Sequence, residues 1–401
     1  MRIALFTDTY APTVNGVARA LGLLVRHAVR AGHEVALVTP TLSDRAADHV
    51  ALHVQLPSVT VPFYEELQAA RLWLGPRNRR ALDSFAPDLV HAATEASVGW
   101  VGRRWALARA IPLVTSYCTN FAEYVHGYRL GALEGVVWRL LERFHGAARI
   151  TFCPSEATRT ELAARGFQRL RIWSRGVDAV QFNPSCRSED VRREMAPGAE
   201  VILAYVGRVA PEKRIDLLMR AFPRIREGTE RKVALVLVGD GPALEDLRRR
   251  NVEGVHFTGY QQGERLAACY ASADVFVFPS DTETFGQVVT EAFASGLPSV
   301  VPDRGGVKDL VIPGETGFRF PPGDAEAFAS AALRLIDDDA LRRRMSLNAR
   351  RVAETRSWDD VFQRLFSHYH DALSPRHGLV TGPHPDVARG THMFPSDPDG
   401  G

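Results

Sequence analysis

The sequence predicts an α/β protein made of two doubly wound, parallel-sheet domains of the Rossmann-like type. Short apolar runs, typical of strands buried on both faces, alternate with amphipathic helical segments in both halves of the chain. The alternation is interrupted from Arg175 to Glu200 by a stretch of turn-forming and charged residues. We interpret that stretch as an exposed connection between the domains.

Composition excludes several classes of protein. The 401 residues are 45% hydrophobic, and the formal net charge of +2 gives no reason to expect nucleic acid as a partner. Four cysteines without a CxxC pair argue against a zinc site or a disulfide framework and favour a reduced cytosol. We find neither a signal peptide nor a run approaching the about 20 apolar residues of a membrane span. We therefore expect a cytoplasmic protein, with any membrane contact peripheral and on the inner face.

The N-terminal half begins with a strand from Arg2 to Thr7 and an amphipathic helix from Val17 to Arg30. The first turn has no GxGxxG, and the second strand ends without an acidic residue for a ribose, so an NAD-dependent oxidoreductase is disfavoured. Instead, Asn15 and Gly16 predict a flexible loop whose amides can approach a phosphate. Further strands are predicted at Ala51–Leu56, Leu89–Ala92, Pro112–Ser116, Ile150–Cys153 and Arg171–Trp173.

A second βα series starts at Val201. Its clearest unit has a buried strand at Val275–Phe278, a polar turn, a helix starting near Phe285 and a second strand at Pro298–Val301. Later segments predict two charged helices, a last helix and a tail without periodicity. We divide the chain into an N-terminal domain (1–175), a C-terminal domain (176–357), a helix packing back toward the N-terminal domain (358–374) and a disordered tail (375–401).

The turn of that βαβ unit places polar groups at the C-terminal edge of the sheet. Glu283 lies in the turn, the amides of Thr284, Phe285 and Gly286 open the helix, and Glu291 follows on it. Helix-opening amides stabilise an anion, whereas carboxylates accept hydrogen bonds from hydroxyls. The alternative for Glu291 is a helix-surface residue, but its mostly apolar neighbours disfavour it. The pattern predicts a ligand with hydroxyls at both ends and phosphates between, such as a nucleotide sugar.

Two cations follow the first strand of the second half. Arg208 and Lys213 are costly at a sheet edge without an anion, and a diphosphate supplies one. The alternative is a solvated Arg208 and a Lys213 paired with Glu212. Gly305 and Gly306, after another strand, are second-rank candidates that turn geometry alone would explain.

Together these motifs resemble the retaining glycosyltransferases of family four, which have the GT-B fold, and the resemblance extends to about Leu373. It implies two Rossmann-like domains facing a cleft, with the acceptor on the N-terminal domain and the nucleotide sugar on the C-terminal one. The matching motifs are GRVAPEK at Gly207–Lys213, Glu283 and Glu291 seven residues apart, GVD at Gly176–Asp178 and PGETGF at Pro313–Phe318.

The resemblance also implies roles for single residues. Arg208 and Lys213 would neutralise the leaving nucleoside diphosphate, Glu283 would accept hydrogen bonds from the donor sugar, and Glu291 would accept them from the ribose. Arg208, Lys213 and Glu283 are the catalytic candidates. The sugar would be transferred with retention, without a protein nucleophile, a metal or any other cofactor.

One position departs from the family pattern. Asn15, Gly16 and Cys118 would complete the donor site from the N-terminal domain, but similar sequences carry a histidine facing the sugar where this chain has Cys118. A thiol is a poorer hydrogen-bond donor and proton carrier than an imidazole. Three interpretations stay open: an altered site, reduced activity, or compensation by His91 or His126.

The donor and acceptor follow only from the overall likeness. DTYAPTVNGVARAL and SYCTNF resemble segments of bacterial GDP-mannose-dependent α-mannosyltransferases and glycolipid synthases, which implies mannose from GDP-mannose and a sugar or lipid-linked acceptor. Arg71–Arg80 and Val101–Ala110 mix arginine with apolar residues, as in contacts to anionic lipid; the alternative is a solvated surface with buried tryptophans. A UDP-glucose or other UDP-sugar enzyme stays open. So does a non-catalytic nucleotide-sugar-binding relic, which Cys118 suggests and the intact charged residues oppose.

Overall fold

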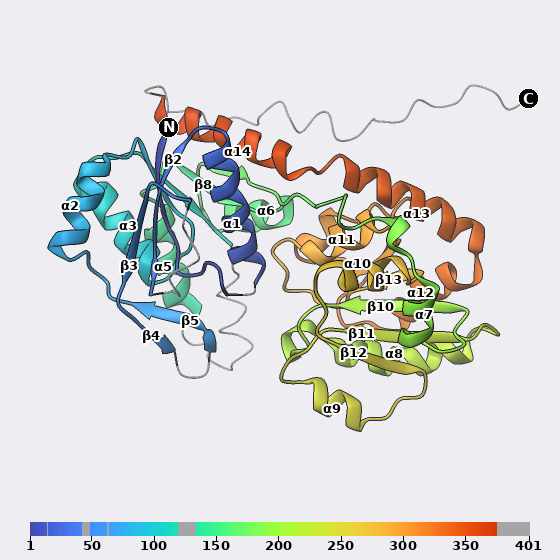
Figure 1. The fold of residues 1–401 in the computed structure, drawn as a ribbon. Coiled ribbons are helices and arrows are strands. Elements are labelled where there is room, and N and C mark those ends of the chain that lie inside the picture. The colour runs from blue at the N-terminus through green and yellow to red at the C-terminus, as the bar shows by residue number, and fades with distance from the viewer. Residues whose placement is uncertain (14, 42–48, 62–63, 119–133, 375–401) are drawn as a thin grey trace, which may run out of the picture.

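The computed structural model describes residues 1–13, 15–41, 49–61, 64–118 and 134–374 of the chain. It consists of two α/β domains with one parallel sheet each, side by side in Figure 1. This confirms the predicted fold class. The calls for a disordered tail and for His126 fall outside the described residues.

The N-terminal sheet has seven strands in the order β3-β2-β1-β6-β7-β8-β9, all parallel. A two-stranded antiparallel hairpin stands apart from it; the sequence analysis missed this hairpin because no continuous apolar run marks it. The strands are β1 (Arg2–Phe6), β2 (Glu34–Pro40), β3 (Leu52–Leu56), β4 (Ser58–Val61), β5 (Tyr64–Ala70), β6 (Leu89–Ala92), β7 (Leu113–Ser116), β8 (Ile150–Cys153) and β9 (Leu170–Ile172). The helices are α1 (Gly16–Arg30), α2 (Pro76–Phe85), α3 (Ser97–Ala108), α5 (Glu134–His145) and α6 (Glu156–Ala164).

The C-terminal sheet has six parallel strands in the order β12-β11-β10-β13-β14-β15. The strands are β10 (Val201–Val206), β11 (Val233–Val238), β12 (Val255–Gly259), β13 (Val275–Val277), β14 (Ser299–Pro302) and β15 (Gly317–Phe320). The helices are α7 (Glu189–Met195), α8 (Ile215–Glu227), α9 (Leu244–Arg249), α10 (Gly263–Ala271), α11 (Gln287–Ala294), α12 (Ala325–Asp337) and α13 (Asp339–Glu354).

Two helix starts differ from the prediction for identifiable reasons. The predicted flexible loop at Asn15 and Gly16 is wrong, because the Asn15 side chain accepts a hydrogen bond from the Ala18 amide and α1 begins at Gly16. The helix expected from about Phe285 begins only at Gln287. Gly286 has φ +97° there, and a Cβ on it would lie 2.5 Å from Val307 Cγ1, so the turn needs glycine.

The chain passes between the two domains twice, and the two passages touch. The Val177 amide donates to the Arg356 carbonyl at 2.9 Å. A Cβ on Gly176 would lie 2.6 Å from the Trp358 nitrogen, so the close approach requires a glycine. After the return, α14 (Trp358–Leu373) lies against the N-terminal domain (Figure 1). Its apolar face joins strand β1 in one core through Val361, Phe362, Leu365, Phe366, Tyr369 and Ala372.

None of the helices in the described ranges is both long and apolar enough to cross a membrane.

Candidate functional site

The predicted site residues come from loops at the C-terminal edge of the second sheet. Arg208 and Lys213 follow β10, and Glu283 follows β13, which is the neighbour of β10 in the sheet. Chain order reverses between these strands, since β11 lies on the other side of β10. Open α/β sheets bind ligands at such a switch point.

Lys213 and Glu283 form the centre of this group. Lys213 Nζ lies 2.5 Å from Glu283 Oε1, and Ser280 Oγ donates to the same oxygen at 3.0 Å. Both charged side chains are only 19% exposed, so each limits the cost of burying the other. The sequence analysis left open a pairing of Lys213 with Glu212; the structure pairs Lys213 with Glu283, and Glu212 lies 3.9 Å from Arg208.

The backbone of Arg208 is fixed by a hydrogen bond, whereas its side chain is partly exposed. The buried Tyr205 hydroxyl donates to the Arg208 carbonyl at 2.8 Å, while the Arg208 side chain is 41% exposed. Burial, together with the nearby carboxylates of Glu283 and Glu212, raises the pKa of Tyr205 well above its usual range, so the hydroxyl stays a donor. The backbone of Arg208 is therefore fixed, while its partly exposed guanidinium can reach an anion.

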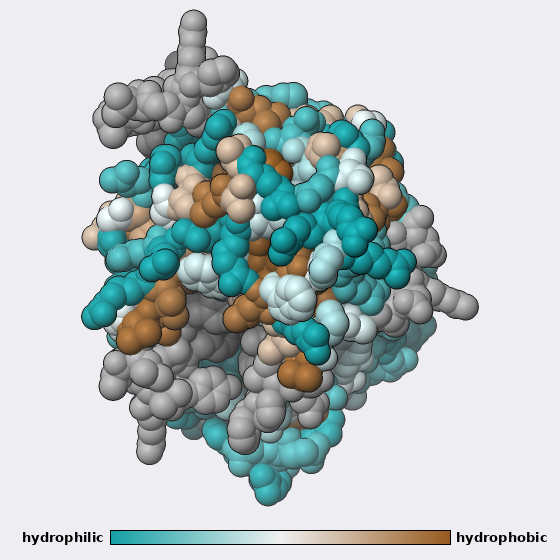
Figure 2. Space-filling view, turned by 90° about the vertical axis from the view of Figure 1, so that its left-hand side faces the viewer, coloured by the Kyte–Doolittle hydropathy of each residue, from teal (hydrophilic) through white to brown (hydrophobic). Residues whose placement is uncertain are grey.

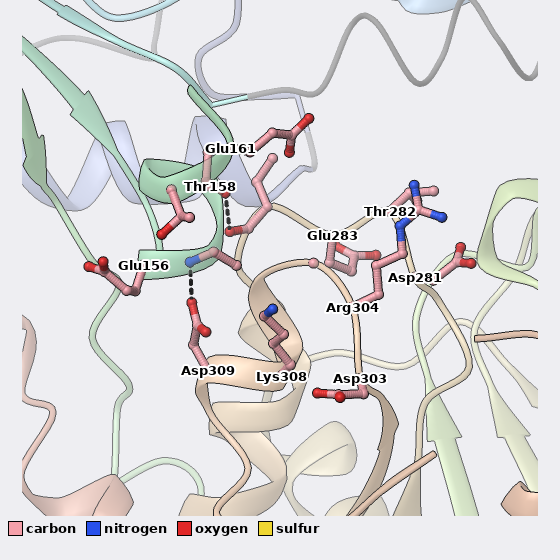
Figure 3. Close-up of a pocket in the computed structure, with 14 residues that line it drawn as sticks. Glu156, Thr158, Glu161, Asp281, Thr282, Glu283, Asp303, Arg304, Lys308 and Asp309 are labelled. Atoms are coloured by element: carbon pink, nitrogen blue, oxygen red, sulfur yellow. Dashed lines mark hydrogen bonds between the residues drawn. The ribbon is translucent and has the colours of Figure 1, made fainter. Parts of the chain in front are cut away.

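A cavity of about 450 Å³ lies beside Glu283 and is lined by both domains. Figure 3 shows α6 side chains of the N-terminal domain, such as Thr158, on one side and Glu283 and Lys308 of the C-terminal domain on the other. Hydrogen bonds join the two domains here. The Ala157 amide donates to Asp309 Oδ2 at 2.6 Å, and Thr158 Oγ1 donates to the Thr284 carbonyl at 3.3 Å (Figure 3).

The second-rank glycines support the Glu283 turn from behind. A Cβ on Gly305, which has φ +66°, would lie 2.7 Å from the Glu283 carbonyl oxygen. A Cβ on Gly306 would lie 2.2 Å from the Thr284 carbonyl oxygen. The loop after β14 therefore packs its backbone directly against the turn, and a larger residue would displace it. Phe285 fixes the same turn by burying its ring in the C-terminal core.

Glu291 is not a helix-surface residue, because it is only 3% exposed. Its carboxylate accepts hydrogen bonds from the Tyr270 hydroxyl at 3.2 Å and from Arg19 Nη1, on α1 of the N-terminal domain, at 2.7 Å. Burial raises the pKa of Glu291, and Arg19 opposes that rise. The sequence analysis missed Arg19, since its spacing from Glu291 along the chain gives no sign of the contact.

Cys118 lies at the domain interface. Its carbonyl accepts a hydrogen bond from Thr284 Oγ1 at 3.2 Å, which places it opposite the Glu283 turn. Its Sγ is buried, 3.6 Å from Arg175 Nη2. Burial raises the pKa of Cys118 to about 11, despite the opposing effect of Arg175, so the side chain is a neutral thiol.

His91 is removed from the candidates for replacing the missing histidine. It lies in the N-terminal core, where Nδ1 is 2.7 Å from the Tyr369 hydroxyl and Nε2 is 2.6 Å from Ser116 Oγ. Both ring nitrogens are thus used by structural partners. Asn15 is likewise engaged, since its amide nitrogen donates to Thr9 Oγ1 at 3.0 Å.

Within the described ranges, His, Cys, Asp and Glu side chains form no group of three or more that could hold a metal ion.

Comparison with known proteins matches both domains. Residues 14–181 match the family described as Glycosyltransferase Family 4, and residues 200–338 match Glycosyl transferases group 1. The chain is 38% identical to a GDP-mannose-dependent alpha-mannosyltransferase of Mycobacterium tuberculosis, over 92% of this chain and 96% of that protein. It is 31% identical to the alpha-monoglucosyldiacylglycerol synthase of Streptococcus pneumoniae, over 75% and 70%. The solved sucrose-phosphate synthase from Thermosynechococcus elongatus superposes with a TM-score of 0.75 at 24% identity, over 92% and 98% of the two chains.

Proposed function

Because the chain belongs to glycosyltransferase family 4 and has the GT-B fold, we propose that it transfers mannose from GDP-mannose to a hydroxyl of a lipid or glycolipid acceptor. The observation that carries the proposal is that Arg208, Lys213 and Glu283 follow neighbouring strands at the switch point, where Lys213 pairs with Glu283 and Glu283 lines the cavity between the domains. The relatives named for GDP-mannose and for a glycolipid product support the donor and the acceptor.

In this proposal each charged group binds a different part of the donor. Arg208 and Lys213 bind the diphosphate and stabilise the negative charge that develops as the bond between the sugar carbon and the phosphate oxygen breaks. Glu283 accepts hydrogen bonds from sugar hydroxyls, and it holds Lys213 in place before the donor arrives. Glu291 accepts hydrogen bonds from the ribose.

We propose that transfer retains the anomeric configuration and needs no metal. The acceptor oxygen attacks the face that the phosphate leaves, and its proton passes to the leaving phosphate oxygen, so no protein nucleophile is required. The two cations supply the positive charge that a divalent ion would otherwise provide. Product analysis by NMR and assays in excess chelator test these two statements; an inverted product or loss of turnover in chelator would contradict them.

A donor screen tests the central proposal. Thermal shift and turnover are measured with GDP-mannose, UDP-glucose, UDP-galactose and UDP-N-acetylglucosamine. A donor at about 100 times its dissociation constant stabilises the folded protein by about 2.7 kcal/mol, a shift of several degrees. We expect the largest shift with GDP-mannose, and its loss in Lys213→Ala and Glu283→Ala. Lys232→Ala is the matched control, because Lys232 is exposed and precedes β11 at the opposite edge of the same sheet.

Other outcomes of the screen identify the alternatives. A shift only with a UDP-sugar would replace the GDP-mannose assignment. Binding without turnover on any acceptor would favour a nucleotide-sugar-binding relic. No binding at about millimolar concentration would refute the proposal as a whole, since ligand linkage predicts a measurable shift there for any donor with physiological affinity.

We also propose a peripheral membrane contact through the N-terminal domain. Leu72 and Trp73 are 55% and 54% exposed, and they precede α2, which carries the exposed arginines 77, 79 and 80. Figure 2 shows apolar patches set among hydrophilic surface on the side of the molecule where this domain lies. Basic residues near an anionic bilayer contribute about 1 kcal/mol each, and exposed tryptophan suits the interface.

Vesicle sedimentation tests the membrane contact. We expect binding to vesicles containing phosphatidylglycerol, weaker binding to pure phosphatidylcholine, and reduced binding for Trp73→Ala. Leu347→Ala is the control, because Leu347 is 62% exposed on α13 of the other domain. Equal binding of the parent and Trp73→Ala would remove this segment from the contact.

A further inference from the structure

The buried carboxylate of Glu291 is shared between the two domains. Arg19 Nη1, in the first turns of α1, lies 2.7 Å from Glu291 Oε1. The Tyr270 hydroxyl, on α10, donates to Oε2 at 3.2 Å. One domain thus supplies a cation to a carboxylate that belongs to the other, at the place where the proposed function puts the ribose.

The two charges of this pair lie in different surroundings. The Glu291 side chain is 5% exposed, whereas that of Arg19 is 43% exposed. The hydrophobic residues around Glu291 on α11, such as Val289 and Phe293, are fully buried, so they cannot solvate a charge. Arg19 therefore places an opposite charge at hydrogen-bond distance, which offsets part of the cost of burying an ionised carboxylate.

The hydrogen-bond capacity of the carboxylate leaves room for a ligand. An ionised carboxylate has about four acceptor positions, two on each oxygen. Arg19 uses one on Oε1 and Tyr270 uses one on Oε2. One position on each oxygen remains, which matches the two vicinal hydroxyls of a ribose. Arg19 and a ribose can thus bind Glu291 together and do not compete.

We infer that Arg19 is a positioning residue for the nucleotide: from the N-terminal domain it orients the Glu291 carboxylate that receives the ribose hydroxyls and places an opposite charge beside it. This role of Arg19 rests on the proposed function, and it adds a coupling between nucleotide binding and the approach of the two domains. Because the ion pair joins α1 to α11, it forms only when the domains are close together. By linkage, nucleotide binding and domain closure then stabilise each other.

Calorimetric titration with GDP and 2′,3′-dideoxy-GDP tests this coupling, with UDP and its dideoxy analogue in parallel. Hydrogen bonds to a charged group are worth about 1.5–3 kcal/mol, so removing the hydroxyls should weaken binding to the parent at least about tenfold. In Arg19→Gln we expect the affinity for GDP to fall about tenfold. The hydroxyl penalty, which is the ratio of the affinities for GDP and dideoxy-GDP, should shrink to about twofold. In Arg19→Lys the loss of affinity caused by removing the hydroxyls should be partly restored, because lysine carries the same charge as arginine but lacks the planar guanidinium group.

Arg30→Gln is the matched control, since Arg30 is an exposed arginine at the other end of α1. It should keep both the GDP affinity and the hydroxyl penalty. General damage to the fold would weaken both nucleotides equally and leave the penalty intact. An unchanged penalty in Arg19→Gln would therefore overturn this inference alone. Failure of the parent to bind either nucleotide would overturn the proposed function and this inference with it.

Discussion

The buried His91 should make the stability of the N-terminal domain depend on pH in a calculable way. Its ring is fully buried between β7 and α14, and burial, together with the nearby Arg175, lowers the pKa of His91 to about 3. In the unfolded chain the ring would titrate near about 6.5. Between these values the unfolded state binds a proton that the folded state does not, so stability is lost as the pH falls below about 6.5.

The magnitude follows from the same two pKa values. Between about pH 7 and about pH 5, the unfolded state gains roughly 2 kcal/mol from protonating this one histidine, while the folded state gains nothing. Replacing His91 with glutamine removes the contribution of this histidine to the pH dependence of stability. It keeps a side chain that can hydrogen-bond Tyr369 and Ser116. We therefore expect His91→Gln to lose roughly 2 kcal/mol less stability than the parent over that interval, whatever its stability at neutral pH.

Urea unfolding followed by tryptophan fluorescence measures this difference. Trp173 is a local reporter, because its ring centroid lies 5.6 Å from that of His91. Other titrating groups are common to both proteins and cancel in the comparison. His370→Gln is the control, since His370 is exposed and stands next to Tyr369, the partner of His91, on α14. If the parent and His91→Gln show the same pH dependence, His91 is protonated in the folded protein and the reasoning fails.

Two further substitutions probe the site itself. Cys118→His should leave transferase activity unchanged or raise it, because it restores the imidazole that similar sequences carry at this position; a large loss in steady-state activity would mean that the cysteine itself is required. Gly306→Ala should lower kcat/KM at least about tenfold, because its Cβ would lie 2.2 Å from the Thr284 carbonyl oxygen and must displace the Glu283 turn. Gly135→Ala, with no atom within 4 Å of its Cβ, is the control, and equal kinetics for the two glycine variants would argue against the packing role.

The fold was predictable because its signals are local. Buried parallel strands appear as short apolar runs, and the amphipathic helices between them follow the 3.6-residue period. Strand boundaries differ from the prediction by one or two residues, as at β13, which ends at Val277 and not at Phe278. The β4–β5 hairpin was missed because neither signal is present there. The resemblance to a family, and not the periodicity, connected the charged loops to a reaction.

Only the part of the candidate site that belongs to the C-terminal domain was predictable from the sequence. Arg208, Lys213 and Glu283 stand next to strands that the sequence reveals, so their shared sheet edge followed from topology. The contact of Arg19 with Glu291 spans 272 positions and depends on how the domains face each other. The same holds for His91, whose partner Tyr369 comes from the last helix. Such pairings depend on tertiary geometry, which a local pattern does not encode.

The return of α14 to the N-terminal domain has a consequence for biosynthesis. One core joins Ile3 and Leu5 of the first strand to Leu365 and Tyr369 of the last helix. During translation the first sheet is therefore made long before the helix that covers one of its faces. Until α14 is synthesised, the apolar side chains that it will cover stay open to water or to chaperones, while the C-terminal sheet can complete its own core. The domain that is made first should thus be the one that finishes folding last.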